Sequence, residues 1–68
     1  MNEKVFKKIR VVGCSPESYQ KAVESAVVKA GASVHGMAWF EVVELRGAIQ
    51  DGKASEWQAT VEIAFKVE

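Results

Sequence analysis

The sequence predicts an α+β protein of order β-α-β-β, a two-layer sandwich in which a three-stranded antiparallel sheet packs on one helix. Three observations carry this prediction. One segment repeats its apolar residues with the period of a helix, three segments have the composition or alternation of strands, and an Asp-Gly pair separates the last two strands. The chain has 68 residues, enough for one domain, which we expect to span 1–68.

The first strand is expected at 4–13, where β-branched residues mix with lysine and arginine up to Gly13. A helix should follow, with Ser15 as its N-cap, Pro16 in its first position and Gly31 at its end. Its apolar residues form a single stripe and are Tyr19, Ala22, Val23, Ala26, Val27 and Ala30. The sheet should cover this stripe.

The C-terminal segment alternates between two faces without interruption, as a half-buried strand does. The face expected to cover the helix carries Trp57, Ala59, Val61, Ile63, Phe65 and Val67. The opposite face carries Gln58, Thr60, Glu62, Ala64 and Lys66.

The segment 37–47, MAWFEVVELRG, does not sort its apolar residues onto one face, because their parity changes before Leu45. A β-bulge near Val43 and Glu44 resolves this, since one extra residue shifts the alternation. The residues then expected to face the helix are Phe40, Val42 and Leu45. Those expected on the opposite face are Trp39, Glu41 and Arg46.

The pair Asp51-Gly52 is a strong hairpin signal, so the segment 37–47 should pair antiparallel with the C-terminal strand. A three-residue loop would set Arg46 opposite Gln58. The same hairpin would bring together two further pairs, Trp39 with Ala64 and Glu41 with Glu62.

Composition narrows the possible partners. Nine basic residues balance nine acidic ones, which disfavours nucleic acid as a partner. No apolar run approaches a membrane span, and the start MNEKVFKK lacks the apolar core of a signal peptide, so a cytoplasmic protein is expected. Cys14 is the only cysteine and no Cys/His spacing suggests a metal site, which leaves oligomerisation as the route to stability.

One face of the predicted sheet remains uncovered by the helix. It carries Trp39, Gln58, Thr60 and Ala64, and thus apolar area that a small monomer rarely leaves in water. Another copy of the chain or a flat ligand should cover this face.

Several short motifs, taken together, resemble the dodecin family over nearly the whole chain. They are a strand ending in Gly13, a Ser-capped helix, WFEV at 39–42, RG at 46–47, EWQ at 56–58 and the final FKVE. The resemblance implies a hollow, dodecameric shell of β-α-β-β subunits that binds flavins in stacked pairs at its two-fold axes.

The resemblance also implies the site residues. Trp39 would stack on the isoalloxazine ring of FMN, riboflavin or FAD, and Gln58 would hydrogen-bond its polar edge; we add Arg46 and His35 to the expected cofactor-binding set. Because two flavins would lie between two symmetry-related tryptophans, little room remains for a substrate. We therefore expect a non-enzymatic protein for flavin storage, buffering and photoprotection.

Two positions depart from the family pattern. His35 stands four residues before the motif tryptophan, where an arginine is usual, and a mostly neutral histidine would weaken contact with the phosphate of FMN. Cys14 stands where threonine or serine is usual, and we expect no effect on the site.

Other interpretations compete with the flavin site. Trp39 could be an interface aromatic without a ligand, and Gln58 an ordinary surface residue. A shell carrying coenzyme A or another nucleotide cofactor is the alternative function, with Lys7, Lys8, Arg10 or His35 near its phosphates. An acid/base enzyme using the carboxylates Glu41, Glu44 and Glu62 is less favoured than salt bridges across a shell interface to Arg46 or a lysine.

Overall fold

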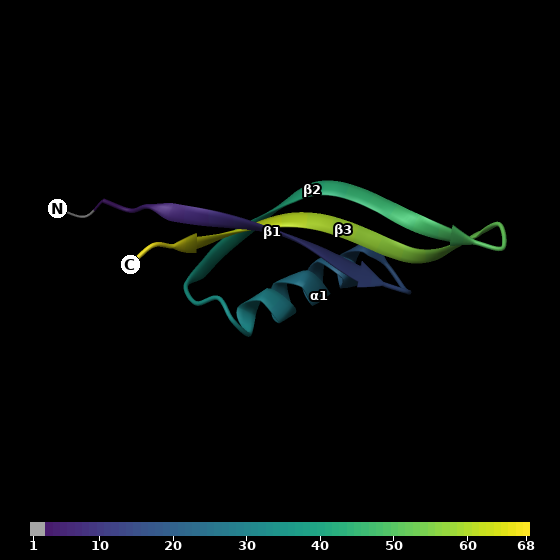
Figure 1. The fold of residues 1–68 in the computed structure, drawn as a ribbon, viewed down its shortest axis with the longest axis horizontal. Coiled ribbons are helices and arrows are strands. Elements are labelled where there is room, and N and C mark those ends of the chain that lie inside the picture. The colour runs from purple at the N-terminus through teal and green to yellow at the C-terminus, as the bar shows by residue number, and fades with distance from the viewer. Residues whose placement is uncertain (1–2) are drawn as a thin grey trace.

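The structure, a computed structural model, describes residues 3–68 and has the predicted β-α-β-β order. Its elements are β1 (Phe6–Ser15), α1 (Tyr19–Gly31), β2 (Met37–Gln50) and β3 (Lys53–Lys66). The sheet order is β1-β3-β2, with β3 antiparallel to both neighbours, and α1 lies on one face of the sheet (Figure 1). The fold class is confirmed, while residues 1 and 2 of the expected domain lie outside the described residues.

Gly13 lies inside β1 and does not end it, so the expected span 4–13 is shifted by two residues at each end. A Cβ atom at Gly13 would overlap the carbonyl oxygen of Ala22 and lie 2.8 Å from the Cβ of Ala26. The glycine thus lets the backbone of α1 approach the strand closely. Its role is packing of the helix on β1.

The N-cap of α1 is Ser18, and the prediction of Ser15 was wrong by one turn. Ser15 still belongs to β1, where it pairs with Trp57, and its hydroxyl accepts hydrogen bonds from the backbone N–H groups of Glu17 and Ser18. These two hydrogen bonds form a turn that connects β1 to α1. Ser18 then has extended backbone angles and accepts from the N–H of Lys21, as an N-cap does.

The core lies between α1 and the centre of the sheet. Ala22 and Ala26 are buried on the predicted stripe of the helix, and Ala26 forms the core cluster with Val61 and Ile63 of β3. The partly buried residues packed against this cluster are Ile9, Val11, Val23, Val27 and Ala30. The helix ends at Gly31 as predicted.

The hairpin turn contains two residues, Asp51 and Gly52, both with positive φ. The predicted three-residue loop was therefore wrong. A second irregularity, which skips Ser55, nevertheless offsets the strands by one residue and places Arg46 opposite Gln58, as predicted. The bulge at Val43 is also confirmed, because the register shifts between Val42 and Glu44.

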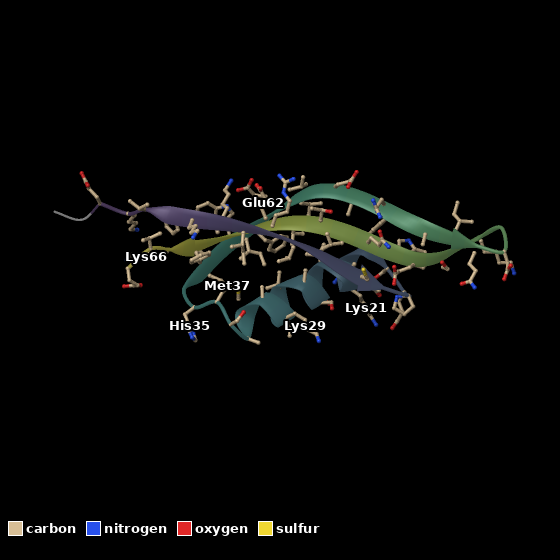
Figure 2. All side chains as sticks on the ribbon, viewed as in Figure 1. Lys21, Lys29, His35, Met37, Glu62 and Lys66 are labelled. Atoms are coloured by element: carbon tan, nitrogen blue, oxygen red, sulfur yellow. The ribbon has the colours of Figure 1, made fainter. Side chains whose placement is uncertain are left out.

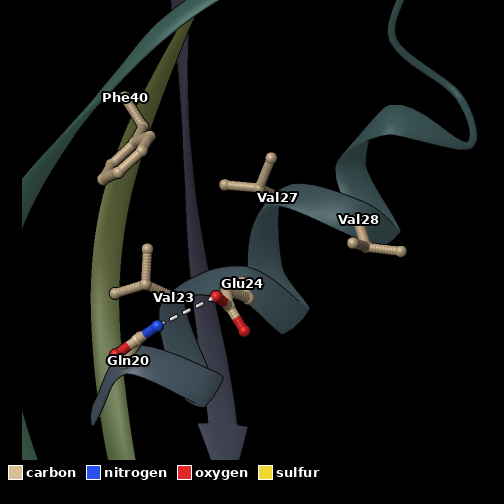
Figure 3. A pocket seen from close by; sticks show the side chains of 6 residues that line it. All are labelled: Gln20, Val23, Glu24, Val27, Val28 and Phe40. Atoms are coloured by element: carbon tan, nitrogen blue, oxygen red, sulfur yellow. Dashed lines mark hydrogen bonds between the residues drawn. The ribbon is translucent and has the colours of Figure 1, made fainter.

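The helix does not cover β2, contrary to the expectation that Phe40, Val42 and Leu45 would enter the core. These three side chains lie opposite the buried residues of β3 but are 50%, 48% and 50% exposed. The reason is that α1 packs mainly on β1 and β3. An apolar groove of about 480 Å³ remains between α1 and β2 (Figure 3), lined by Gln20, Val23, Glu24, Val27, Val28 and Phe40.

Candidate functional site

The outer face, by which we mean the face of the sheet opposite α1, carries the predicted site residues Trp39, Gln58 and Arg46. Its central strand contributes Glu62, which points away from α1 in Figure 2. The register places Trp39 beside Ala64 and Glu41 beside Glu62, as predicted from the sequence. Trp39 remains 44% exposed on this face.

The indole of Trp39 is held by a hydrogen bond along its polar edge. Its Nε1–H donates to Oε2 of Glu41 over 2.8 Å, and the same oxygen lies 2.7 Å from Nζ of Lys8. The hydrogen bond from Lys8, and then that from the indole, lower the pKa of Glu41, and the bond to Glu41 raises the pKa of Lys8. Glu41 is therefore a carboxylate at neutral pH.

Phe6 lies beside the indole of Trp39. The two ring centroids are 4.8 Å apart and the rings are tilted by 58°. Ala64 lies between Lys8 and Trp39 in the register and is fully buried, although it belongs to the outer face. We attribute this burial to the large side chains on either side of so small a residue, and it makes Trp39 part of a packed surface.

The amide of Gln58 is oriented by two neighbours. Arg46 donates through Nε to Oε1 of Gln58 over 2.7 Å, and Nε2 of Gln58 donates to Oε1 of Glu56 over 2.7 Å. An amide oxygen accepts two hydrogen bonds and an amide nitrogen donates two. Gln58 thus retains one acceptor position and one donor for a ligand.

The structure does not bring Trp39 and Gln58 together within one chain. Trp39 lies beside Ala64, and Ala64 is six residues along β3 from Gln58. At a rise of about 3.3 Å per residue, the backbone positions of Ala64 and Gln58 are about 20 Å apart along the strand. That separation exceeds the length of a three-ring isoalloxazine, so one ring cannot contact both residues of the same chain.

His35 and Cys14 are both exposed. His35 lies in the segment between α1 and β2 and points away from the sheet (Figure 2). Cys14 is exposed in β1, where it pairs with Gln58.

Two acidic residues of the outer face form ion pairs. Glu41 pairs with Lys8, and Glu62 accepts from Nε and Nη2 of Arg10 over 3.3 and 3.0 Å. The expected salt bridge of Glu41 to a lysine is therefore present, although within one chain. In the described part of the chain, no three or more His, Cys, Asp or Glu side chains are placed to hold a metal ion.

Sequence reasoning missed Phe6, Lys8 and Glu56 as neighbours of the site. Phe6 and Lys8 have the same parity as Arg10 in β1, so they share its side of the sheet. The signal was the alternation of β1, which becomes informative only once its register with β3 is known.

The fold and the outer face define a small β-α-β-β protein that presents an exposed aromatic ring and an oriented amide on an uncovered sheet. The chain belongs to the dodecin family, since the family model described as Dodecin matches residues 5–68.

Individual relatives agree with this assignment. Dodecin of Thermus thermophilus is 37% identical over 65 residues, which cover 96% of this chain and 94% of that protein. The structure of dodecin from Streptomyces coelicolor aligns with a TM-score of 0.95 at 35% identity, covering 100% of this chain and 97% of the other.

A third relative differs in what it binds. The calcium-chelating antigen calcium dodecin of Mycobacterium tuberculosis has a novel calcium-binding site; it aligns with a TM-score of 0.82 at 32% identity, covering 94% of this chain and 91% of that one. Within residues 3–68, no helix has the length and apolar character to span a membrane.

Proposed function

We propose that this protein is a non-enzymatic flavin-binding dodecamer that stores, buffers and photoprotects FMN or riboflavin. The observation that carries the proposal is Trp39, a large aromatic side chain 44% exposed on a sheet face that its own helix cannot cover. The chain's membership of the dodecin family supports the proposal.

Trp39 would supply the flat surface on which the ring stacks. Phe6 lies against the indole at a tilt, and the hydrogen bond to Glu41 uses only the ring's N–H edge. Stacking of a nucleobase on an aromatic side chain is worth about 1–3 kcal/mol, which is a fair analogue for a flavin.

Gln58 and Arg46 would recognise the polar edge of the ring. Gln58 keeps one acceptor and one donor, which matches an edge of alternating N–H and C=O groups. Arg46 holds the amide through Nε and has further N–H donors in its guanidinium group. His35 stands in place of the usual arginine and has fewer N–H donors for a phosphate than a guanidinium group, which favours riboflavin over FMN.

The site would be shared between copies of the chain. Trp39 and Gln58 are too far apart on one sheet to hold the same ring, so the indole of one copy and the amide of another would have to meet. The exposed apolar side chains of β2 support association as well, because a lone chain leaves Phe40, Val42 and Leu45 about half exposed.

Trp39 would also protect the ligand from light. A bound flavin supplies an excited state that accepts an electron, and an electron-rich indole in contact can donate that electron and then take it back. This cycle produces no net oxidation. Stacking on both sides of the ring would exclude a substrate, which is why we propose storage in place of catalysis.

The coenzyme A alternative has less support. Two of the cations considered for its phosphates, Lys8 and Arg10, already pair with Glu41 and Glu62. An acid/base enzyme has less support still, since these carboxylates lie on an open sheet and are engaged by cations.

The direct test is a titration of the purified protein with riboflavin and with FMN, followed by flavin fluorescence. We expect strong quenching at micromolar protein and loss of most of it in Trp39→Ala. Trp57→Phe is the control, because Trp57 has the opposite parity in β3 and should leave quenching intact. Unquenched flavin with the unmodified protein would refute the proposal.

A further inference from the structure

One carboxylate oxygen on the outer face has two donors from different strands. Oε2 of Glu41 in β2 accepts from the indole N–H of Trp39, two residues earlier in the same strand, over 2.8 Å. The same oxygen lies 2.7 Å from the ammonium of Lys8 in β1, on the far side of β3. This arrangement links the two edge strands across the central one, and it ends at the residue on which the flavin proposal depends.

We propose that Glu41, anchored by Lys8, is a positioning residue that fixes the orientation of the Trp39 indole for stacking. This inference rests on the proposed flavin site, but it concerns the chain's own side chains and can be tested without flavin.

An exposed tryptophan on a sheet can adopt several rotamers, and only some of them present a ring face to a ligand. A hydrogen bond at Nε1 lies in the plane of the indole, so it restricts rotation while leaving the π surface open. Restricting the ring in advance removes an ordering cost that binding would otherwise carry.

The surroundings of Glu41 explain why its carboxylate can be held in place. Glu62 lies directly across the register from Glu41, and like charges at that spacing repel. Arg10 engages Glu62 at 3.0 Å, which leaves Lys8 for Glu41. Ala64 in the register between Lys8 and Trp39 provides space for a long side chain to cross β3.

The expected contribution concerns orientation more than stability. Lys8 and Glu41 are 43% and 45% exposed at their side chains, and exposed ion pairs add little to folding. Removing the carboxylate should therefore loosen the indole without unfolding the protein. That combination distinguishes a positioning role from a general structural one.

The experiment uses the full chain with Trp57→Phe, so that all tryptophan emission comes from Trp39. Time-resolved anisotropy of this emission measures the fast local motion of the indole, and riboflavin titration measures binding. The variants are Glu41→Ala, Glu41→Gln and Lys8→Met. Glu62→Ala is the matched control, because it removes the neighbouring carboxylate without touching Trp39.

We expect Glu41→Ala to increase the amplitude of fast depolarisation and to weaken riboflavin binding about tenfold, as expected for loss of a hydrogen bond to a charged group. Glu41→Gln, which still offers an acceptor oxygen, and Lys8→Met should have intermediate effects. Glu62→Ala should behave as the parent. Equal indole motion in Glu41→Ala and Glu62→Ala would overturn the inference.

The two proposals can fail separately. If the parent protein does not bind riboflavin but Glu41→Ala mobilises the indole, the flavin proposal fails and the positioning role of Glu41 stands. If the parent binds and quenches riboflavin while Glu41→Ala leaves both the anisotropy of Trp39 and the affinity for riboflavin unchanged, only the positioning role of Glu41 is refuted. Should Glu41→Ala not assemble, Lys8→Met and Glu41→Gln decide the same question.

Discussion

Glu41 links the charge state of one carboxylate to the position of an aromatic ring. Its pKa lies below the ordinary value of 4.5, because Lys8 and the indole N–H favour the charged form. The carboxylate of Glu41 thus binds a proton more readily in the unfolded chain than in the folded one. Its contribution to the stability of the fold is therefore present above pH 4.5 and is lost as the pH falls through the lowered pKa of Glu41.

The contribution of Lys8 to stability depends on pH in the opposite direction. Its pKa is raised above 10.5 by the bond to Glu41, so its contribution is present below pH 10.5 and is lost as the pH rises through the raised value. Arg10 and Glu62 are the other charged groups in the same register rows on this face.

We therefore predict that the fast anisotropy of Trp39, measured in Trp57→Phe, stays constant at intermediate pH and increases at both extremes. The acid transition should disappear in Glu41→Gln and persist in Glu62→Gln. An acid transition that survives in Glu41→Gln would contradict the assignment to Glu41.

The individual site residues were predictable only in part. Trp39, Gln58 and Arg46 could be assigned to one face, because alternation and one bulge determine which side a residue takes. Their neighbours could not be predicted, since contacts such as Phe6 with Trp39 depend on the register of β1, which no hairpin turn sets.

Among the elements, the contact between α1 and β1 depends on a residue without a side chain. We predict that Gly13→Ala destabilises the protein by about 3 kcal/mol, since the added Cβ would overlap the carbonyl oxygen of Ala22 and force the helix away. Thermal or denaturant unfolding, with the oligomeric state held constant, measures this cost.

Gly52→Ala is the matched comparison. No atom lies within 4 Å of the added Cβ, and only the positive φ of 75° opposes the change, at about 1 kcal/mol. Equal losses of unfolding free energy in Gly13→Ala and Gly52→Ala would show that the close approach of α1 to Gly13 is unimportant.

The elements themselves were predictable from periodicity, whereas their ends were not. Ser15 was predicted to be the N-cap, but its pairing with Trp57 keeps it in β1, and Ser18 caps the helix instead. The predicted loop was one residue too long. Ser55 has no partner in the register, and this irregularity offsets the two strands by one residue, as a third turn residue would have done. Both errors arise from pairing between distant segments, which local patterns do not encode.

At the scale of the whole molecule, the arrangement of Trp39 and Gln58 predicts complementation. Trp39→Ala and Gln58→Ala chains, unfolded and refolded together, should regain about a quarter of intact sites, because random mixing places an intact indole opposite an intact amide at that frequency. Riboflavin quenching of the mixture, compared with the two variants refolded separately, measures the recovery. No recovery would mean that both groups act from a single chain.

At this scale, the groove between α1 and β2 was not predicted, because the helix was expected to cover the apolar side chains of β2. Alternation shows that Phe40 points toward the helix side of the sheet, but not how far the helix extends beneath it. The fully buried large side chains within the described residues are only Val61 and Ile63. So small an interior is consistent with a chain that completes its packing by association.

The bulges of β2 also matter before any association takes place. This strand forms one edge of the sheet, and a straight, apolar edge can recruit the strands of other newly made chains into fibrils. Shifts at Ala38 and Val43 interrupt its regular spacing, so a second strand cannot align along its full length. The irregularity that directs Trp39 outward therefore also protects the unassembled subunit from aggregation.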